Sequence, residues 1–166
     1  AIAQGNAGDE VTIISHMAHE SGRGKIEPNV RTVEIFGNAN PGSVAHGLRF
    51  VRKATNWAYE HRNEFDIIHV HSGFADHMIA TSRIKRKSKL PTVHTLYCPV
   101  PTSGGRWNLP LVKQFLLRSA CRIDALAAMS QNVATSMELW GLKNIQVVQP
   151  AVDLERFNVN SGGSIR

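Results

Sequence analysis

Residues 66–73 read DIIHVHSG, and residues 90–97 read LPTVHTLY. Both runs are short and rich in Ile, Val and His, which is typical of β-strands bounded by polar or turn-forming residues. The segment between them is compatible with a helix and is long enough to cross over between two parallel strands. The two runs therefore predict a β-α-β unit, and the rest of the chain is interpreted around it.

Polar residues close both predicted strands. In open α/β sheets, ligands collect outside the carboxyl ends of parallel strands, so we expect these residues to lie side by side on one edge of a crevice. A glycine there permits close backbone approach, and the helix that follows directs free N–H groups at an anion. The expected ligand-facing residues are His71, Ser72, Gly73, His94 and Thr95.

Two histidines of the first run share one strand face, because side chains alternate along a strand. We expect His69 to be structural and His71, at the end of the strand, to contact a ligand. Neither this pair nor His16 with His19 is followed by further ligands at a familiar spacing, so the sequence predicts no metal site. The long loop 96–107, rich in Pro and Gly, adds Tyr97 and Arg106 as weaker candidates for ligand binding.

Apolar spacing elsewhere predicts an α/β domain with a Rossmann-like, open and mostly parallel sheet that has helices on both faces. The run at 66–71 is nearly continuous and apolar, which is typical of a parallel strand covered on both sides. Ser130 and Gly141 are the expected start and stop of one helix. Expected strands are 11–15, 30–36, 66–71, 90–95, 123–129 and 145–148, and expected helices are 43–63, 75–84, 109–120 and 132–140.

Length and composition fit one globular domain. The 166 residues are 42% hydrophobic and 19% charged, and no apolar run reaches the length of a membrane-spanning helix. No secretory leader pattern stands at the start. Cys98 and Cys121 lack a C-x-x-C spacing, which favours reduced thiols and a cytoplasmic protein.

The net charge is +6, and residues 83–89 concentrate Arg and Lys. Such a run binds an anionic membrane surface, binds nucleic acid, or simply offsets the dipole at a helix end. Nucleic acid is disfavoured because no aromatic and basic platform accompanies the charge. The membrane surface and the helix end remain equally open, so a peripheral membrane location is an alternative to a purely cytoplasmic one.

Four motifs occur in order: DIIHVHS at 66–72, LPTVHT at 90–95, RIDALAAMS at 122–130 and VVQPAVDLERF at 147–157. This pattern resembles the N-terminal half of a family 4 retaining glycosyltransferase of the GT-B fold. The resemblance implies a domain at 1–157, a linker or tail at 158–166, and a first strand that this sequence lacks. A sheet without that central strand presents unpaired edges, and a homodimer through such an edge is one consequence that we consider.

The resemblance also implies a function. The family moves a glycosyl group, such as a hexose, from a nucleotide-sugar donor that sits mainly in a C-terminal domain, and needs no metal or other cofactor. The half seen here would bind the acceptor, which is a sugar, a lipid or a phosphorylated small molecule, and would be inactive alone. His94 matches a histidine that contacts the transferred sugar, and Thr95 and Ser72 match positions that touch an acceptor phosphate.

Other interpretations stay open. Without the resemblance, the residue type favours His94 as a strand-end imidazole whose hydrogen bonds are satisfied by neighbouring backbone, and the resemblance favours the sugar contact instead. The whole chain is alternatively a non-catalytic, Rossmann-like binding module for a phosphorylated small molecule or an anionic surface. A dinucleotide oxidoreductase is disfavoured, because no G-x-G-x-x-G motif follows a visible strand.

Overall fold

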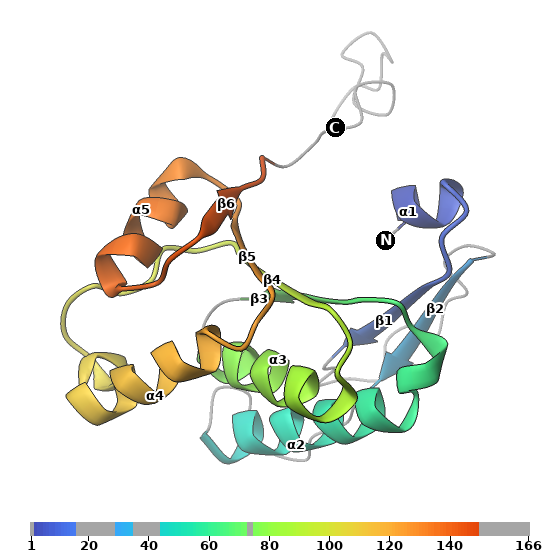
Figure 1. Cartoon of the computed structure of the whole chain (residues 1–166), viewed down its shortest axis with the longest axis horizontal. Coiled ribbons are helices and arrows are strands. Elements are labelled where there is room, and N and C mark those ends of the chain that lie inside the picture. The colour runs from blue at the N-terminus through green and yellow to red at the C-terminus, as the bar shows by residue number, and fades with distance from the viewer. Residues whose placement is uncertain (1, 16–28, 35–43, 73–74, 150–166) are drawn as a thin grey trace, which may run out of the picture.

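The computed structural model describes residues 2–15, 29–34, 44–72 and 75–149. Within these ranges the strands form two sheets whose neighbouring strands are all parallel (Figure 1). One sheet pairs β1 (Val11–Ser15) with β2 (Val30–Glu34). The other has the order β3-β4-β5-β6, with bounds Ile68–Ser72, Thr92–Leu96, Ala125–Ala128 and Ile145–Val147. The predicted α/β fold with parallel strands is confirmed.

Helices connect the strands of the larger sheet one after another. Because β3 to β6 are neighbours in chain order, right-handed crossovers place all of their connecting helices on one side of the sheet. Helix α2 packs against α3, so it lies on that side as well, and Figure 1 shows α2, α3 and α4 below the strands. The helices are α1 (Ile2–Asn6), α2 (Val44–Glu60), α3 (Ala75–Ser88), α4 (Pro110–Ala120) and α5 (Gln131–Trp140), with short 3-10 turns at Arg62–Glu64 and Arg106–Asn108.

The hydrophobic core fills the space between the four-stranded sheet and its helices. Leu96 and Leu126 point into it from the strands and are buried together with Met78, Leu116 and Met137 of the helices. We call this side of the sheet the helix face. Alternation along each strand sends the other residues to the opposite side, the open face.

The open face corrects one expectation. The run at 66–71 was expected to be covered on both sides, but Ile67 is 55% exposed and the side chains of His69 and His71 are also exposed. The reason is topological, because the described helices between β3 and β6 all fall on the helix face. Near-continuous apolar sequence therefore gave the correct strand but the wrong burial.

Helix boundaries follow local chemistry. Ser130 caps α5, because its side-chain oxygen accepts a hydrogen bond from the Val133 N–H at 3.3 Å, and Gly141 ends the helix with a left-handed φ of 109°. Both predictions are confirmed. Helix α3 was expected to end at Ile84 but runs to Ser88, because Lys and Arg are good helix formers. The basic run is therefore mostly helical and not a turn.

Some expectations cannot be compared with the structure. The predicted tail at 158–166, Gly73, His16 and His19 lie outside the described residues. Among the described strands, β1 pairs with β2 alone and β3 pairs with β4 alone. Within the described part of the chain, each of the two sheets therefore has an edge strand with one unpaired side. None of the described helices is long and apolar enough to cross a membrane.

Candidate functional site

The carboxyl ends of β3 and β4 lie next to each other, as the β-α-β prediction requires. Across this pair His71 stands opposite Thr95, and Ser72 stands opposite Leu96. His71 and Thr95 lie on the open face, whereas Leu96 lies in the core. The strand pairing therefore brings His71 and Thr95, two of the expected site residues, together on one face of the sheet.

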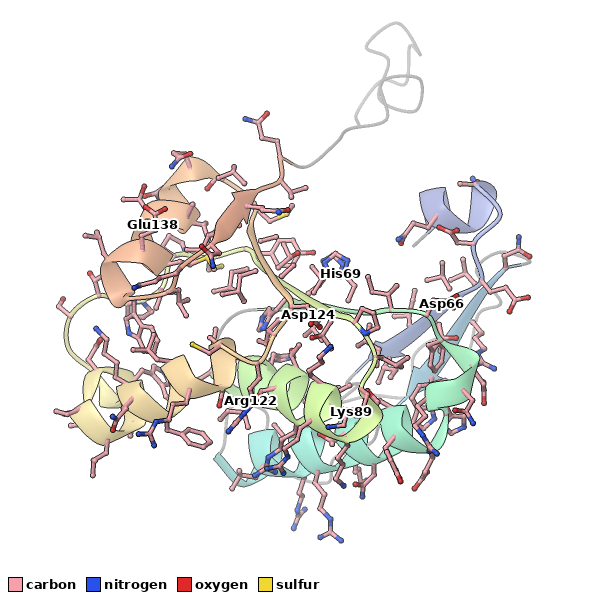
Figure 2. All side chains as sticks on the ribbon, in the orientation of Figure 1. Asp66, His69, Lys89, Arg122, Asp124 and Glu138 are labelled. Atoms are coloured by element: carbon pink, nitrogen blue, oxygen red, sulfur yellow. The ribbon has the colours of Figure 1, made fainter. Side chains whose placement is uncertain are left out.

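Four side chains of the open face form what we call the histidine–tyrosine cluster: His69, His71, Thr95 and Tyr97. The imidazole Nε2 of His69 lies 2.8 Å from the hydroxyl oxygen of Thr95, and the rings of His69 and His71 have centroids 3.8 Å apart. The Nδ1 atom of His71 is hydrogen-bonded to the Tyr97 hydroxyl. Figure 2 shows His69 projecting from the sheet on the side away from α3. The shared face of the two histidines is thus confirmed.

The surroundings of the cluster favour the neutral form of both of its imidazoles. Partial burial lowers the pKa of His69, and the neighbouring His71 lowers it further. Partial burial also lowers the pKa of His71. Neutral imidazoles and a phenol offer both donors and acceptors, together with flat ring faces. Such groups suit a polyhydroxylated ligand better than a strongly charged one.

His94 is on the helix face and is the third residue of β4, with Val70 and Leu126 opposite it. Its relative exposure is 0%. Burial lowers its pKa to about 3, and the nearby His77, His69 and His71 lower it too, while Asp76 acts in the opposite direction. The His94 imidazole is therefore neutral at physiological pH and lies within the core, away from the open face.

A threonine of α3 favours one tautomer of this imidazole. The Thr81 hydroxyl donates to the His77 carbonyl oxygen at 2.7 Å, so its proton is already engaged. Its oxygen also lies 3.5 Å from Nδ1 of His94, where it can then only accept. This contact favours the form of His94 protonated on Nδ1. A catalytic role for His94 stays a prediction.

A further polar pair, Asp76 and His77 in the first turn of α3, was not predicted from the sequence. The Asp76 Oδ1 atom accepts hydrogen bonds from the backbone N–H and the ring Nδ1 of His77, both at 3.0 Å. The His77 bond holds the pKa of Asp76 below its usual value. A carboxylate at this position offsets the positive end of the helix dipole. It thereby reduces the attraction of this helix end for an anionic ligand.

The remaining site predictions concern the strand end and the loop that follows β4. Arg106 begins the 3-10 turn Arg106–Asn108, but the side chains of Arg106 and Ser72 are outside what the structure describes. Asn108 anchors this loop, because its amide nitrogen donates to the Gly104 carbonyl oxygen at 2.6 Å and its amide oxygen accepts from the indole N–H of Trp140 at 3.0 Å. The loop is therefore fixed to the buried end of α5.

Within the described ranges, no three His, Cys, Asp or Glu side chains come together in a group that could hold a metal ion. The predicted metal independence of the chemistry is not tested by this observation and stays a prediction.

Comparison with known proteins identifies the family. A family model described as Glycosyltransferase Family 4 matches residues 1–156. The chain belongs to glycosyltransferase family 4. No curated protein matches the chain. Among solved structures, HepE of Anabaena, crystallised in complex with UDP and glucose, is similar to this family 4 domain with a TM-score of 0.51 and 14% sequence identity. The similarity covers 76% of this chain and 33% of HepE, so the chain spans about a third of that protein's length. The likeness supports the predicted fold.

Proposed function

We propose that this domain binds the acceptor in a retaining glycosyltransferase that moves a sugar from a nucleotide-sugar donor to an acceptor hydroxyl. Family membership supports the glycosyl-transfer reaction. The histidine–tyrosine cluster is the observation that supports the acceptor role, because neutral hydrogen-bonding groups and flat rings gather at one edge of the sheet. A sugar hydroxyl or a lipid-linked sugar fits this chemistry.

Glycosyl transfer asks for three things: a contact on the transferred sugar, stabilisation of the leaving diphosphate and an oriented acceptor hydroxyl. In this proposal a C-terminal domain supplies the nucleotide-sugar site, without a metal, and the present domain alone does not turn over. HepE, which holds UDP and glucose, supports a nucleotide-sugar donor by similarity of fold. The location of the reaction would be the cytoplasm, which fits the exposed, free Cys98 and Cys121.

Individual residues have distinct proposed roles. His71 and Tyr97 bind and orient the acceptor hydroxyl from the open face. Thr95, whose hydroxyl contacts His69, holds that imidazole in place. His94 contacts the transferred sugar through its imidazole or its backbone. Proposed contacts to an acceptor phosphate come from Ser72, Gly73 and Arg106.

The test uses the full-length enzyme with UDP-glucose as the donor probe and measures KM for donor and acceptor separately. Tyr97→Phe and His71→Gln should each raise the acceptor KM about tenfold, which corresponds to a lost hydrogen bond of about 1.4 kcal/mol. The donor KM should stay unchanged. The matched control is His61→Gln, whose ring contacts the Trp57 carbonyl oxygen and not the cluster. An effect confined to the donor KM, or equal effects in the control, would contradict the acceptor role.

A non-catalytic binding module is the second candidate, favoured by the burial of His94 away from the open face. The two candidates differ in turnover. Joining the C-terminal domain should produce donor-dependent release of nucleoside diphosphate in an enzyme, and none in a binding module. A homodimer is compatible with either candidate function. The outer edge of β3 offers backbone N–H and C=O groups to a strand of a second copy. Such a dimer would show as a concentration-dependent mass in analytical ultracentrifugation.

A further inference from the structure

The outward side of helices α2, α3 and α4 forms one broad surface. Helix α3 packs against both α2 and α4, and Figure 1 shows the three side by side. Exposed cations come from all three helices and from the turn after α4. We call this area the basic helical surface, and its cations are Arg49, Arg52, Lys53, Arg83, Arg86, Lys87, Arg118 and Arg122.

The charge of this surface is one-sided. The sequences of the three helices contain nine Lys and Arg residues, namely three in α2, four in α3 and two in α4, against two acidic residues. Lys85 is neutralised by Asp124 at 2.8 Å, and Asp76 is bonded to His77. The Lys87 ammonium donates to the Asn56 amide oxygen at 3.1 Å, so it joins the edges of α2 and α3. The combined potential of the surface is therefore strongly positive.

Large apolar side chains stand among these cations. On α4, Leu111 is 82% exposed and Phe115 is 50% exposed, and they lie one helical turn apart beside Arg118. On α2, Leu48 is 56% exposed and Tyr59 is 42% exposed. Cations combined with exposed Leu and Phe on the same helices are typical of segments that lie in the interface of a lipid bilayer.

We propose that the basic helical surface binds a bilayer that contains anionic lipid. The cations meet the headgroups, and Leu111 and Phe115 enter the boundary of the acyl chains. Anionic lipid headgroups complement a surface of one sign of charge, and the acyl region accommodates exposed apolar residues that a nucleic acid backbone would leave in water. This membrane contact goes beyond glycosyl transfer and does not depend on it.

The first test is sedimentation of the full chain with vesicles of phosphatidylcholine alone or of an equimolar mixture with phosphatidylserine. We expect binding to the mixed vesicles only, weakened by added salt. The triple variant Arg83→Gln, Arg86→Gln, Lys87→Gln should bind on the order of 100-fold more weakly, since each cation contributes about fivefold near an anionic surface. Circular dichroism checks that the variant is folded.

Matched single variants separate position from net charge. Arg83→Gln should reduce vesicle binding about fivefold, whereas Lys143→Gln, which removes an exposed cation between α5 and β6, should leave it unchanged. For the apolar contribution, Leu111→Gln should weaken binding about fivefold. Its control is Leu139→Gln, which replaces a side chain on α5 that is 71% exposed.

Three results would overturn the proposal. The first is equal sedimentation with the two kinds of vesicle, or none with either. The second is a loss of binding by Lys143→Gln as large as that by Arg83→Gln, which would show a response to net charge alone. The third is duplex RNA competing the protein off the vesicles through the same cations with no effect of Leu111→Gln, which would make the surface a nucleic-acid site.

Discussion

The two faces of the four-stranded sheet place the same residue type in opposite situations. His94 lies on the helix face with 0% exposure and a pKa of about 3, whereas His69 and His71 on the open face are exposed and bonded to hydroxyl groups. All three histidines belong to two adjacent strands. The difference teaches that the covering helices, and not the strand sequence, decide which histidine side chains are exposed.

The largest contrast between the faces should appear in stability. Leu96 is fully buried on the helix face, and the next residue, Tyr97, is 44% exposed on the open face. Leu96→Ala should lower the free energy of unfolding by about 3 kcal/mol, because it leaves a cavity in the core. Tyr97→Ala should cost about 1 kcal/mol or less. Urea denaturation measures both, and equal losses would contradict the division of the sheet into two faces.

A smaller effect should follow from pH. The pKa of His94 is about 3 in the folded protein against an ordinary value of 6.5, so below pH 6.5 the unfolded chain binds a proton that the folded chain does not. The contribution of His94 to the free energy of unfolding therefore falls as the pH falls from 6.5 towards 3. The loss is about 1.4 kcal/mol per pH unit, or about 2 kcal/mol at about pH 5.

His94→Gln removes this proton uptake, so its unfolding free energy should depend less on pH across that range. The matched variant His69→Gln changes an exposed imidazole and should leave most of the slope in place. Denaturation curves at several pH values decide between them. If the unfolding free energy of His94→Gln depended on pH as steeply as that of the wild type, the lowered pKa of the buried His94 would be contradicted.

The smallest effect concerns Asp124 and Thr92, which lie where β5 and β4 begin. The Asp124 carboxylate accepts hydrogen bonds from the Thr92 N–H at 2.8 Å and the Thr92 hydroxyl at 3.0 Å, and it pairs with Lys85. The Lys85 contact holds its pKa below the usual value. Asp124→Asn should cost about 1 kcal/mol, because the site is partly exposed and solvent screens the pair. The control is Asp66→Asn, which changes another exposed carboxylate. An equal loss of unfolding free energy in the control, measured by urea denaturation, would show that the contacts of Asp124 add no stability.

Local sequence was enough to predict several elements. The strand Val11–Ser15 was predicted with the bounds that the structure has, and Ser130 and Gly141 marked α5 correctly, because alternation, capping and a left-handed glycine are local effects. The end of α3 was missed, since Lys and Arg signal both a helix and a solvated turn. Local chemistry does not decide that case.

For the candidate site, the sequence predicted which residues lie on neighbouring strands but not which of them are buried. Parallel pairing placed His71 beside Thr95 as expected. The burial of His94 was not accessible in the same way, because it depends on which face the helices cover and hence on the whole topology. Asp76 and His77 carried no signal, since one acid and one histidine at a helix start are common on solvated surfaces.

The strand order β3-β4-β5-β6 also bears on how the chain folds. Each strand pairs with the one that precedes it along the chain, so every new pairing closes a loop of a single helix and its connections. Short closures cost little chain entropy and favour rapid assembly. The four-stranded sheet can therefore grow in the order in which a ribosome releases it, with each helix covering the strands already in place.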